Sequence, residues 1–110
     1  MNILFVCTGN TCRSPMAAAL FNKIAIEKNL DVKIESAGIF ASDGEGASNE
    51  AIIAMKNYDI DLLAHHSQSI NSELLEKSDL ILTMTAAHKM VLIPSAPDKT
   101  YTLCEFAGVD

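Results

Sequence analysis

The sequence predicts an α/β fold in which a doubly wound, four-stranded parallel sheet forms one domain over residues 1–110. Short apolar runs rich in strand-forming residues alternate along the chain with segments whose apolar residues recur at helical spacing. This alternation is typical of parallel strands joined by helices that cover both faces of the sheet. The length of 110 residues suffices for one buried core and not for two.

The first predicted unit is a strand, a tight polar turn and a helix. Residues 2–6 form an apolar run that suits a strand buried on both faces, and the polar turn covers residues 7–14. A helix is expected over residues 15–28, because Pro15 fits a first helical turn. Apolar residues recur there at helical spacing (Met16, Leu20, Ile24 and, less strictly, Phe21).

The remaining elements follow from alternation, caps and breakers. Residues 32–36 alternate as a strand, and the glycine-containing segment 37–47 is expected to be a loop. Helices are predicted from Ser48 to about residue 57, from Asn71 or Ser72 to Lys77, and from Thr85 to about residue 93. Strands are predicted over residues 79–84 and 99–103, and Cys104 is expected to be a structural residue at the end of the last one.

Charge and cysteine content narrow the range of partners. The net charge of −6 gives no basic footprint for nucleic acid or for an anionic membrane surface. The three cysteines lack zinc-site spacing, and the short apolar start has no basic leader and cannot span a bilayer. We therefore expect a reduced, cytoplasmic protein without a metal or cofactor.

The candidate site is the polar turn after the first strand, where five residues separate Cys7 from Arg13 and Ser14 follows. Ligands of parallel sheets bind at the carboxyl ends of the strands, which is where this turn lies. Phosphoryl transfer to sulfur requires a thiolate, whereas a free cysteine is mostly a thiol at neutral pH. A helix N-terminus, inward backbone N–H groups, the Arg13 charge and the Ser14 hydroxyl together could stabilise that anion.

The same turn could hold a phosphoryl group. Arg13 would grip two of its oxygens, and the backbone would supply the remaining donors from Thr8, Gly9, Asn10, Thr11, Cys12, Arg13 and Ser14. Gly9 permits a tight turn, and Asn10 tolerates the positive φ that a concave ring of amides requires. The alternative is a buried structural cysteine and a solvated arginine. Nucleotide loops are excluded, because no Gly-Lys-Ser/Thr follows and Gly9 stands alone.

Residues 6–15, Val-Cys-Thr-Gly-Asn-Thr-Cys-Arg-Ser-Pro, with Met16 and Ala17, resemble the low molecular weight protein tyrosine phosphatases. The resemblance continues through residues 36–38, the region of His65, and residues 79–84 and 102–106. It implies that Cys7 forms a cysteinyl-phosphate intermediate and that Arg13 binds phosphate. By the same resemblance, Asn10, Ser14, Ser36 and His65 brace the loop by hydrogen bonds, although His65 alone is equally compatible with an ordinary structural histidine.

Substrate preference is expected to depend on Thr11 and Phe40. The tyrosine-specific members usually carry Ile at the position of Thr11, whereas Thr resembles the bacterial protein-arginine phosphatases. The resemblance also implies that Phe40 lines the rim of the pocket; the alternative is an ordinary loop anchor. We expect a phosphorylated protein substrate and inorganic phosphate as product, with phosphoarginine slightly favoured over phosphotyrosine.

The sequence departs from this family near residue 110. The family takes its general acid from an Asp-Pro pair followed by a C-terminal helix, and this sequence contains neither. Asp110 is the nearest candidate for the acid, and a missing acid would lower the rate by about 10² to 10⁴. We expect an apparently truncated domain whose sheet is bare on part of one face and self-associates there. More distant alternatives are arsenate reduction, for which the relay cysteines are missing, and a non-catalytic phosphate-binding module.

Overall fold

The computed structural model describes residues 1–108 and has a four-stranded sheet of order β2-β1-β3-β4. The strands are β1 (Asn2–Cys7), β2 (Lys33–Gly38), β3 (Leu80–Thr83) and β4 (Thr100–Thr102). Every pairing is parallel, and Val6 at the centre pairs with Ala37 on one side and Thr83 on the other. The predicted fold class is confirmed.

Among residues 1–108, five helices connect and follow the strands: α1 (Arg13–Glu27), α2 (Asn49–Lys56), α3 (Ser72–Lys77), α4 (Ala86–Leu92) and α5 (Leu103–Ala107). The helix α1 begins two residues before Pro15, where the sequence placed its start. Pro15 fits this position because the first-turn N–H groups of a helix have no partner within the helix. Arg13 and Ser14 therefore belong both to the polar turn and to the first turn of α1.

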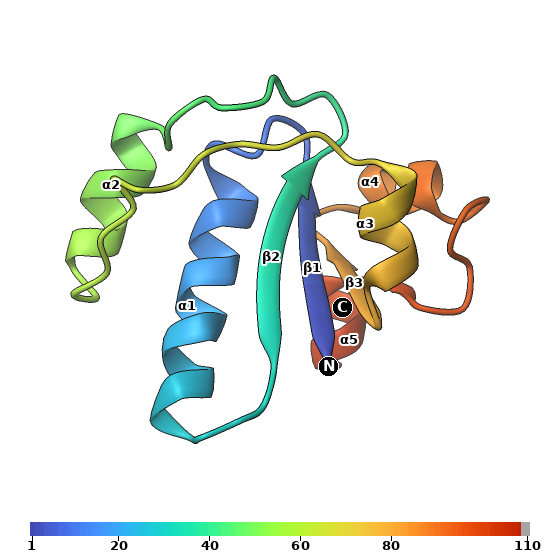
Figure 1. Ribbon diagram of the computed structural model, residues 1–110, viewed down its shortest axis with the longest axis horizontal. Coiled ribbons are helices and arrows are strands. Elements are labelled where there is room, and N and C mark those ends of the chain that lie inside the picture. Colours follow the sequence, from blue (N-terminus) through green and yellow to red (C-terminus); the bar gives the residue numbers. More distant parts are fainter. Residues whose placement is uncertain (109–110) are drawn as a thin grey trace.

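The central strands β1 and β3 are buried on both faces, as predicted for the first strand, whereas the edge strands β2 and β4 are partly exposed. Figure 1 shows α1 and α2 on one side of the sheet and α3 and α4 on the other. On the α3 and α4 side, Leu4, Val6, Ala37 and Ile81 pack with Leu74, Leu92 and Ala96. On the α1 side, Ile3, Phe5, Leu80 and Leu82 form the core, and the ring of Phe5 lies 5.2 Å from that of Phe21.

A smaller cluster joins α1 to α2. Met16 and Leu20 pack against Ala51 and Met55 of α2, as the helical spacing predicted. Ile24 does not share this burial; it is 45% exposed. The α2 cluster lies against the N-terminal half of α1, so Ile24, one turn beyond Leu20, points into solvent.

The last strand ends earlier than predicted, because Leu103 begins α5 instead of extending β4. Thr102 and Glu105 form a reciprocal capping box, in which each side chain accepts a hydrogen bond from the other residue's backbone N–H. Cys104 consequently lies on this helix, exposed and unpaired, so the prediction of a structural cysteine at a strand end is wrong. Within residues 1–108, no helix is both long and apolar enough to cross a membrane.

Candidate active site

The turn after β1 lies at the carboxyl edge of the sheet (Figure 1), and the side chain of Cys7 at its start is buried. Cys7 is only 2% exposed, and its Sγ lies 3.2 Å from the backbone nitrogen of Asn10, which donates to it. The Oγ of Ser14 lies 2.9 Å from the same sulfur. Asn10 has a φ of 56°, the positive value predicted, which turns its N–H back toward Cys7.

The buried side chain of Asn10 organises this turn. Its Nδ2 donates to Ser14 Oγ and to Ser36 Oγ, both at 2.9 Å, and its Oδ1 accepts from the backbone N–H of Gln68 at 2.9 Å. An amide nitrogen only donates, so Ser14 Oγ is the acceptor in that bond. The hydroxyl hydrogen of Ser14 is therefore free to point at the sulfur, which is the direction that stabilises a thiolate.

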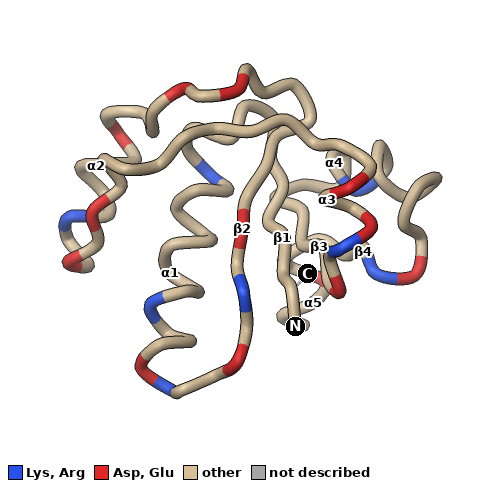
Figure 2. Tube along the Cα trace, viewed as in Figure 1, with Lys and Arg blue, Asp and Glu red and all other residues tan. Residues whose placement is uncertain are grey.

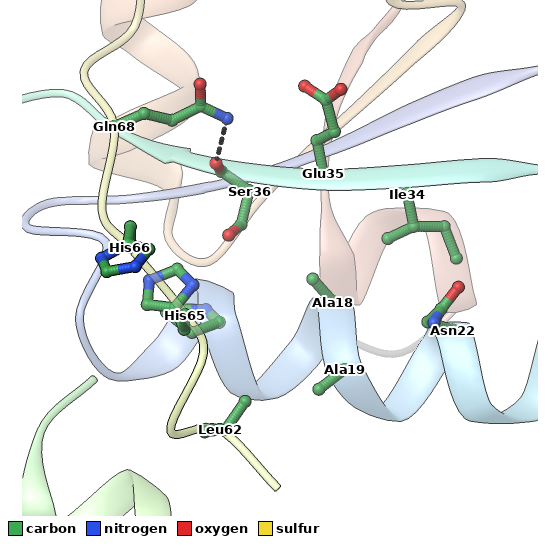
Figure 3. A pocket seen from close by; sticks show the side chains of 11 residues that line it. Ala18, Ala19, Asn22, Ile34, Glu35, Ser36, Leu62, His65, His66 and Gln68 are labelled. Carbon is green, nitrogen blue, oxygen red and sulfur yellow. Dashed lines mark hydrogen bonds between the residues drawn. The ribbon is translucent and has the colours of Figure 1, made fainter. Parts of the chain in front are cut away.

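His65 holds the same residue from the other side. Its Nε2 lies 2.7 Å from the backbone oxygen of Asn10, and because a carbonyl only accepts, Nε2 must carry the hydrogen. The sequence-predicted residues Asn10, Ser14, Ser36 and His65 thus form one connected hydrogen-bond network. The network adds Gln68, whose backbone N–H donates to Asn10 and whose Nε2 donates to the backbone oxygen of Ser36 at 2.9 Å (Figure 3). Sequence reasoning missed this residue, because both contacts join residues far apart in the chain.

Gly38 is a further residue whose role sequence reasoning missed. A Cβ atom at this position would lie 2.5 Å from the carbonyl oxygen of Thr8 and 3.0 Å from the backbone nitrogen of Asn10. The turn is packed this closely because Ile39 N–H donates to Cys7 O and Phe40 N–H donates to Thr8 O. In contrast, a Cβ at Gly9 would meet only Thr11 Oγ1, at 3.8 Å, and it is Asn10 that takes the positive φ.

The N-terminus of α1 is open toward this turn. Each of α2, α3, α4 and α5 begins with a capping side chain (Ser48, Asn71, Thr85 and Thr102), whereas α1 has no side-chain cap and no acidic residue in its first turn. Uncapped N–H groups and the helix dipole favour an anion at that end. Arg13, the only arginine in the sequence, is the first residue of this helix. Within residues 1–108 it has no carboxylate partner.

Comparison with known proteins identifies this arrangement. Residues 2–109 match the model of the family "Low molecular weight phosphotyrosine protein phosphatase". The chain belongs to this family.

Two relatives and one solved structure illustrate the similarity. The chain is 46% identical over 109 residues to a protein-arginine-phosphatase of Bacillus subtilis, covering 96% of this chain and 72% of the relative. It is 39% identical to the low molecular weight protein-tyrosine-phosphatase PtpB of Staphylococcus haemolyticus, covering 98% and 75%. The structure of YwlE arginine phosphatase, a mutant with a phosphorylated active-site serine, superimposes with a TM-score of 0.92 at 45% identity, covering 96% and 71%. The chain is therefore a cysteine-dependent protein phosphatase.

The residues expected to govern substrate preference lie at the edge of the phosphatase turn. Thr11 is half-buried, and its carbonyl accepts a hydrogen bond from the Ser48 N–H at 2.7 Å. The side chain of Phe40 is 82% exposed, although its backbone is fixed on Thr8. This exposure fits a rim residue and argues against an anchor. Asp110, the candidate general acid, lies outside the described residues.

The α4 helix contributes a residue that sequence reasoning did not select. His88 is 7% exposed, and its Nε2 lies 2.9 Å from Thr8 Oγ1. Burial, and after it the nearby charge of Arg13, lower the pKa of His88, so the ring is neutral at physiological pH. Its position, three residues after the Thr85 cap, gave no sequence signal, because the contact joins residues 80 positions apart.

A cavity of about 280 Å³ lies behind the phosphatase turn, between α1, β2 and residues 62–68. In Figure 3, Ala18 and Asn22 project from α1 toward β2, and His65 lies near Ser36. Cys7 and Arg13 are not among its lining residues. This cavity therefore adjoins the network around Asn10 and is separate from the face on which a phosphoryl group would meet the sulfur.

The charges around the site are mostly acidic. Figure 2 shows acidic positions along the segment between β2 and α2, which passes over the carboxyl edge of the sheet and whose sequence contains Asp43 and Glu45. Attraction of a phosphoryl group to this edge therefore depends on local donors, namely the turn, the helix N-terminus and Arg13, since the protein's net charge is repulsive.

Proposed function

We propose that the chain removes phosphoryl groups from protein side chains through a cysteinyl-phosphate intermediate on Cys7, and that it acts on phosphoarginine in preference to phosphotyrosine. The observation that carries the proposal is the buried Cys7 sulfur, which has the Asn10 N–H at 3.2 Å and the Ser14 hydroxyl at 2.9 Å. Two hydrogen-bond donors aimed at one sulfur favour its ionised, nucleophilic form.

In the first step the Cys7 thiolate attacks the phosphorus, the S–P bond forms, and the bond from phosphorus to the substrate nitrogen or oxygen breaks. The phosphoryl oxygens are held by Arg13 and by backbone N–H groups of residues 8–14 as charge moves onto the leaving atom. The protein side chain leaves with a proton supplied by an acid.

In the second step a water molecule attacks the phosphorus of cysteinyl phosphate. The P–O bond forms, the S–P bond breaks, and the electron pair returns to sulfur, where the Ser14 hydroxyl and Asn10 N–H stabilise it again. Inorganic phosphate leaves. The reaction is a hydrolysis that needs no redox partner.

Asp110 is our candidate for the acid of the first step, from its place in the sequence. An aryl phosphate with a good leaving group needs little help from an acid, so the cysteine step can be measured separately with such a substrate.

The preference for phosphoarginine rests on Thr11. Its Oγ1 lies beside Gly9 in the loop, where a hydroxyl replaces the larger apolar side chain expected for tyrosine specificity. The similarity to a protein-arginine-phosphatase of Bacillus subtilis supports this preference. Phosphotyrosine is the second candidate, supported by the similarity to PtpB of Staphylococcus haemolyticus.

The test compares phosphoarginine and phosphotyrosine peptides of one sequence as substrates of the wild-type chain and of Cys7→Ser, Thr11→Ile and Cys104→Ser. We expect the wild type to have the higher kcat/KM for phosphoarginine, and Cys7→Ser to be inactive on both peptides. Thr11→Ile should lower the phosphoarginine-to-phosphotyrosine ratio about tenfold, the effect of a small change in a pocket wall.

Cys104→Ser is the matched control, because Cys104 is an exposed cysteine on α5, outside residues 7–14 that form the turn. Its kinetics should equal those of the wild type. Full activity in Cys7→Ser would refute the cysteine mechanism, whereas a ratio that Thr11→Ile leaves unchanged would refute only the assignment of specificity. We also propose that the protein is cytoplasmic and that the phosphatase domain extends over residues 1–110.

A further inference from the structure

The phosphatase loop, the turn formed by residues 7–14 after β1, receives more hydrogen bonds from one side than from the other. In the part of the chain that the structure describes, hydrogen bonds reach residues 8–12 from several places beyond the loop and α1. Most of them join the loop to residues 36–68. Phe40 donates to Thr8 O, and Ser48 donates to Thr11 O. Asn10 accepts from His65 and Gln68 and donates to Ser36. The bond between Thr8 Oγ1 and His88 Nε2, at 2.9 Å, is the one that comes from α4 on the opposite side.

The second ring nitrogen of His88 decides the direction of that bond. Nδ1 is buried and has no hydrogen-bond partner among the described residues. A buried N–H without an acceptor is rarer and costlier than a buried acceptor without a donor, so the hydrogen of the neutral ring belongs on Nε2. His88 therefore donates to Thr8 Oγ1.

The direction of this hydrogen bond determines where the Thr8 hydroxyl hydrogen can point. Because the Thr8 oxygen accepts from His88, its own hydroxyl hydrogen is not used in that bond and is free for another acceptor. Thr8 is exposed and follows Cys7 directly in the sequence. A phosphorylated ligand bound over the sulfur brings oxygen acceptors to this part of the loop.

We propose that His88 is a positioning residue of the phosphatase site, whose Nε2–H fixes Thr8 and thereby holds the α4 edge of the loop and directs the Thr8 hydroxyl hydrogen to the bound substrate. The inference rests on the proposed function, since it assumes that a phosphoryl group occupies the loop. It adds α4 to the elements that control the site.

The neutral ring suits this position. Burial and the Arg13 charge both oppose protonation of His88, so the ring leaves Arg13 as the cation of the loop. An apolar residue of similar size could fill the same space without leaving a buried nitrogen unpaired. The bond to Thr8 therefore gives a physical reason for a polar ring at this position.

The experiment is a double-mutant cycle on His88→Leu and Thr8→Val, with His88→Gln as the conservative variant. For each protein, kcat and KM are measured with an activated aryl phosphate, together with the inhibition constant of inorganic phosphate and the melting temperature. We expect His88→Leu and Thr8→Val each to lower kcat/KM about tenfold, the effect of losing one hydrogen bond that orients a reacting group. The double variant should lose no more than either single one, because both remove the same bond.

Two further variants separate positioning from stability. His88→Gln keeps a donor at the end of the side chain and should recover most of kcat/KM. Leu92→Val, on the same helix, removes one buried methylene from the core that α4 forms with the sheet and does not touch the loop. It should lower the melting temperature while leaving kcat/KM of the folded protein unchanged.

The inference is overturned if His88→Leu behaves like Leu92→Val, with lowered stability and unchanged kinetics, or if the losses in the double variant add. Should His88→Leu not fold, Thr8→Val decides alone, and wild-type kcat/KM and phosphate inhibition in that variant would overturn the inference. A wild-type chain that hydrolyses no aryl phosphate contradicts the proposed function instead, so the two failures are distinguishable.

Discussion

Replacing Gly38 by alanine is expected to damage the active site although the residue carries no chemistry. Its Cα faces the phosphatase loop, and an added Cβ would lie 2.5 Å from Thr8 O, 2.9 Å from Ala41 Cβ and 3.0 Å from Asn10 N. Two of these three neighbours are backbone atoms of the loop, which cannot rotate away as the end of a side chain could. The loop itself has to move.

The size of the movement sets the expected effect. A carbon and a carbonyl oxygen in contact lie about 3.3 Å apart, so the Thr8 carbonyl must retreat by about 0.8 Å. Misplacement of reacting groups by about 1 Å can cost about 100-fold in rate, and overpacking of this kind costs about 1 to 3 kcal/mol of folding stability. We therefore expect Gly38→Ala to lose about 100-fold in kcat/KM and to remain folded at room temperature.

The assay is steady-state hydrolysis of an activated aryl phosphate, with the thermal melt of each protein measured in parallel. Gly46→Ala is the matched control, because a Cβ at Gly46 meets nothing within 4 Å and the same substitution should leave kcat/KM and the melting temperature near wild type. Wild-type kcat/KM in Gly38→Ala would refute the reasoning, since it would mean that the loop tolerates displacement from the sheet.

Three further predictions concern the Cys7 sulfur, the buried His88 and an exposed pair of aromatic residues. Ser14→Ala removes the hydroxyl 2.9 Å from Cys7 Sγ. Because hydrogen bonds to charged groups contribute about 1.5 to 3 kcal/mol, alkylation of Cys7 by iodoacetamide at pH ~7 should slow about 10- to 100-fold. An unchanged rate would exclude that hydroxyl as a stabiliser of the thiolate. Burial and the Arg13 charge lower the folded-state pKa of His88. As the pH falls below about 6.5, His88 therefore binds a proton in the unfolded chain before it does so in the folded chain. The folding stability that is present above this pH is lost as the pH falls toward the folded-state pKa. The melting temperature of His88→Gln should accordingly fall less than that of the wild type between pH ~7.5 and pH ~5.5, and equal falls would contradict this linkage. The rings of Tyr101 and Phe106 lie 5.9 Å apart and these residues are 40% and 53% exposed, and we propose that a second copy of the chain covers this pair. Sedimentation velocity should show concentration-dependent dimers, and a monomer at all concentrations would dismiss the proposal.

The parts of the fold that depend on local sequence were predictable. The strand over residues 2–6 was visible as an apolar run, and the caps Ser48, Asn71 and Thr85 marked three helices because a capping side chain acts on its own first turn. The capping box of α5 was equally local, Thr102 followed three residues later by Glu105, but it was hidden by the expectation that the last strand continued to Leu103.

The parts of the site that depend on long-range packing were not predictable from this one sequence. Cys7, Asn10 and Ser14 lie within one turn, so the thiolate, the positive φ and the stabilising hydroxyl could be predicted from the residue types in that turn, while the bracing hydrogen bonds were implied by the family resemblance. Gly38 and His88 act on that turn from other elements, through a close backbone approach and a contact 80 residues distant. Neither feature leaves a pattern along the chain, because each depends on which elements the sheet topology brings together.

The measurement that tests the central claim most directly is rapid acid quenching of the chain during turnover of an activated aryl phosphate, followed by mass mapping of the modified residue. If the turn after β1 holds sulfur as the nucleophile, one phosphoryl group is found on Cys7 and none on Cys12, and Ser14→Ala, in which a smaller fraction of Cys7 is ionised, forms it more slowly. Turnover with no phosphoryl group on Cys7, or with the group on another side chain, would contradict the account.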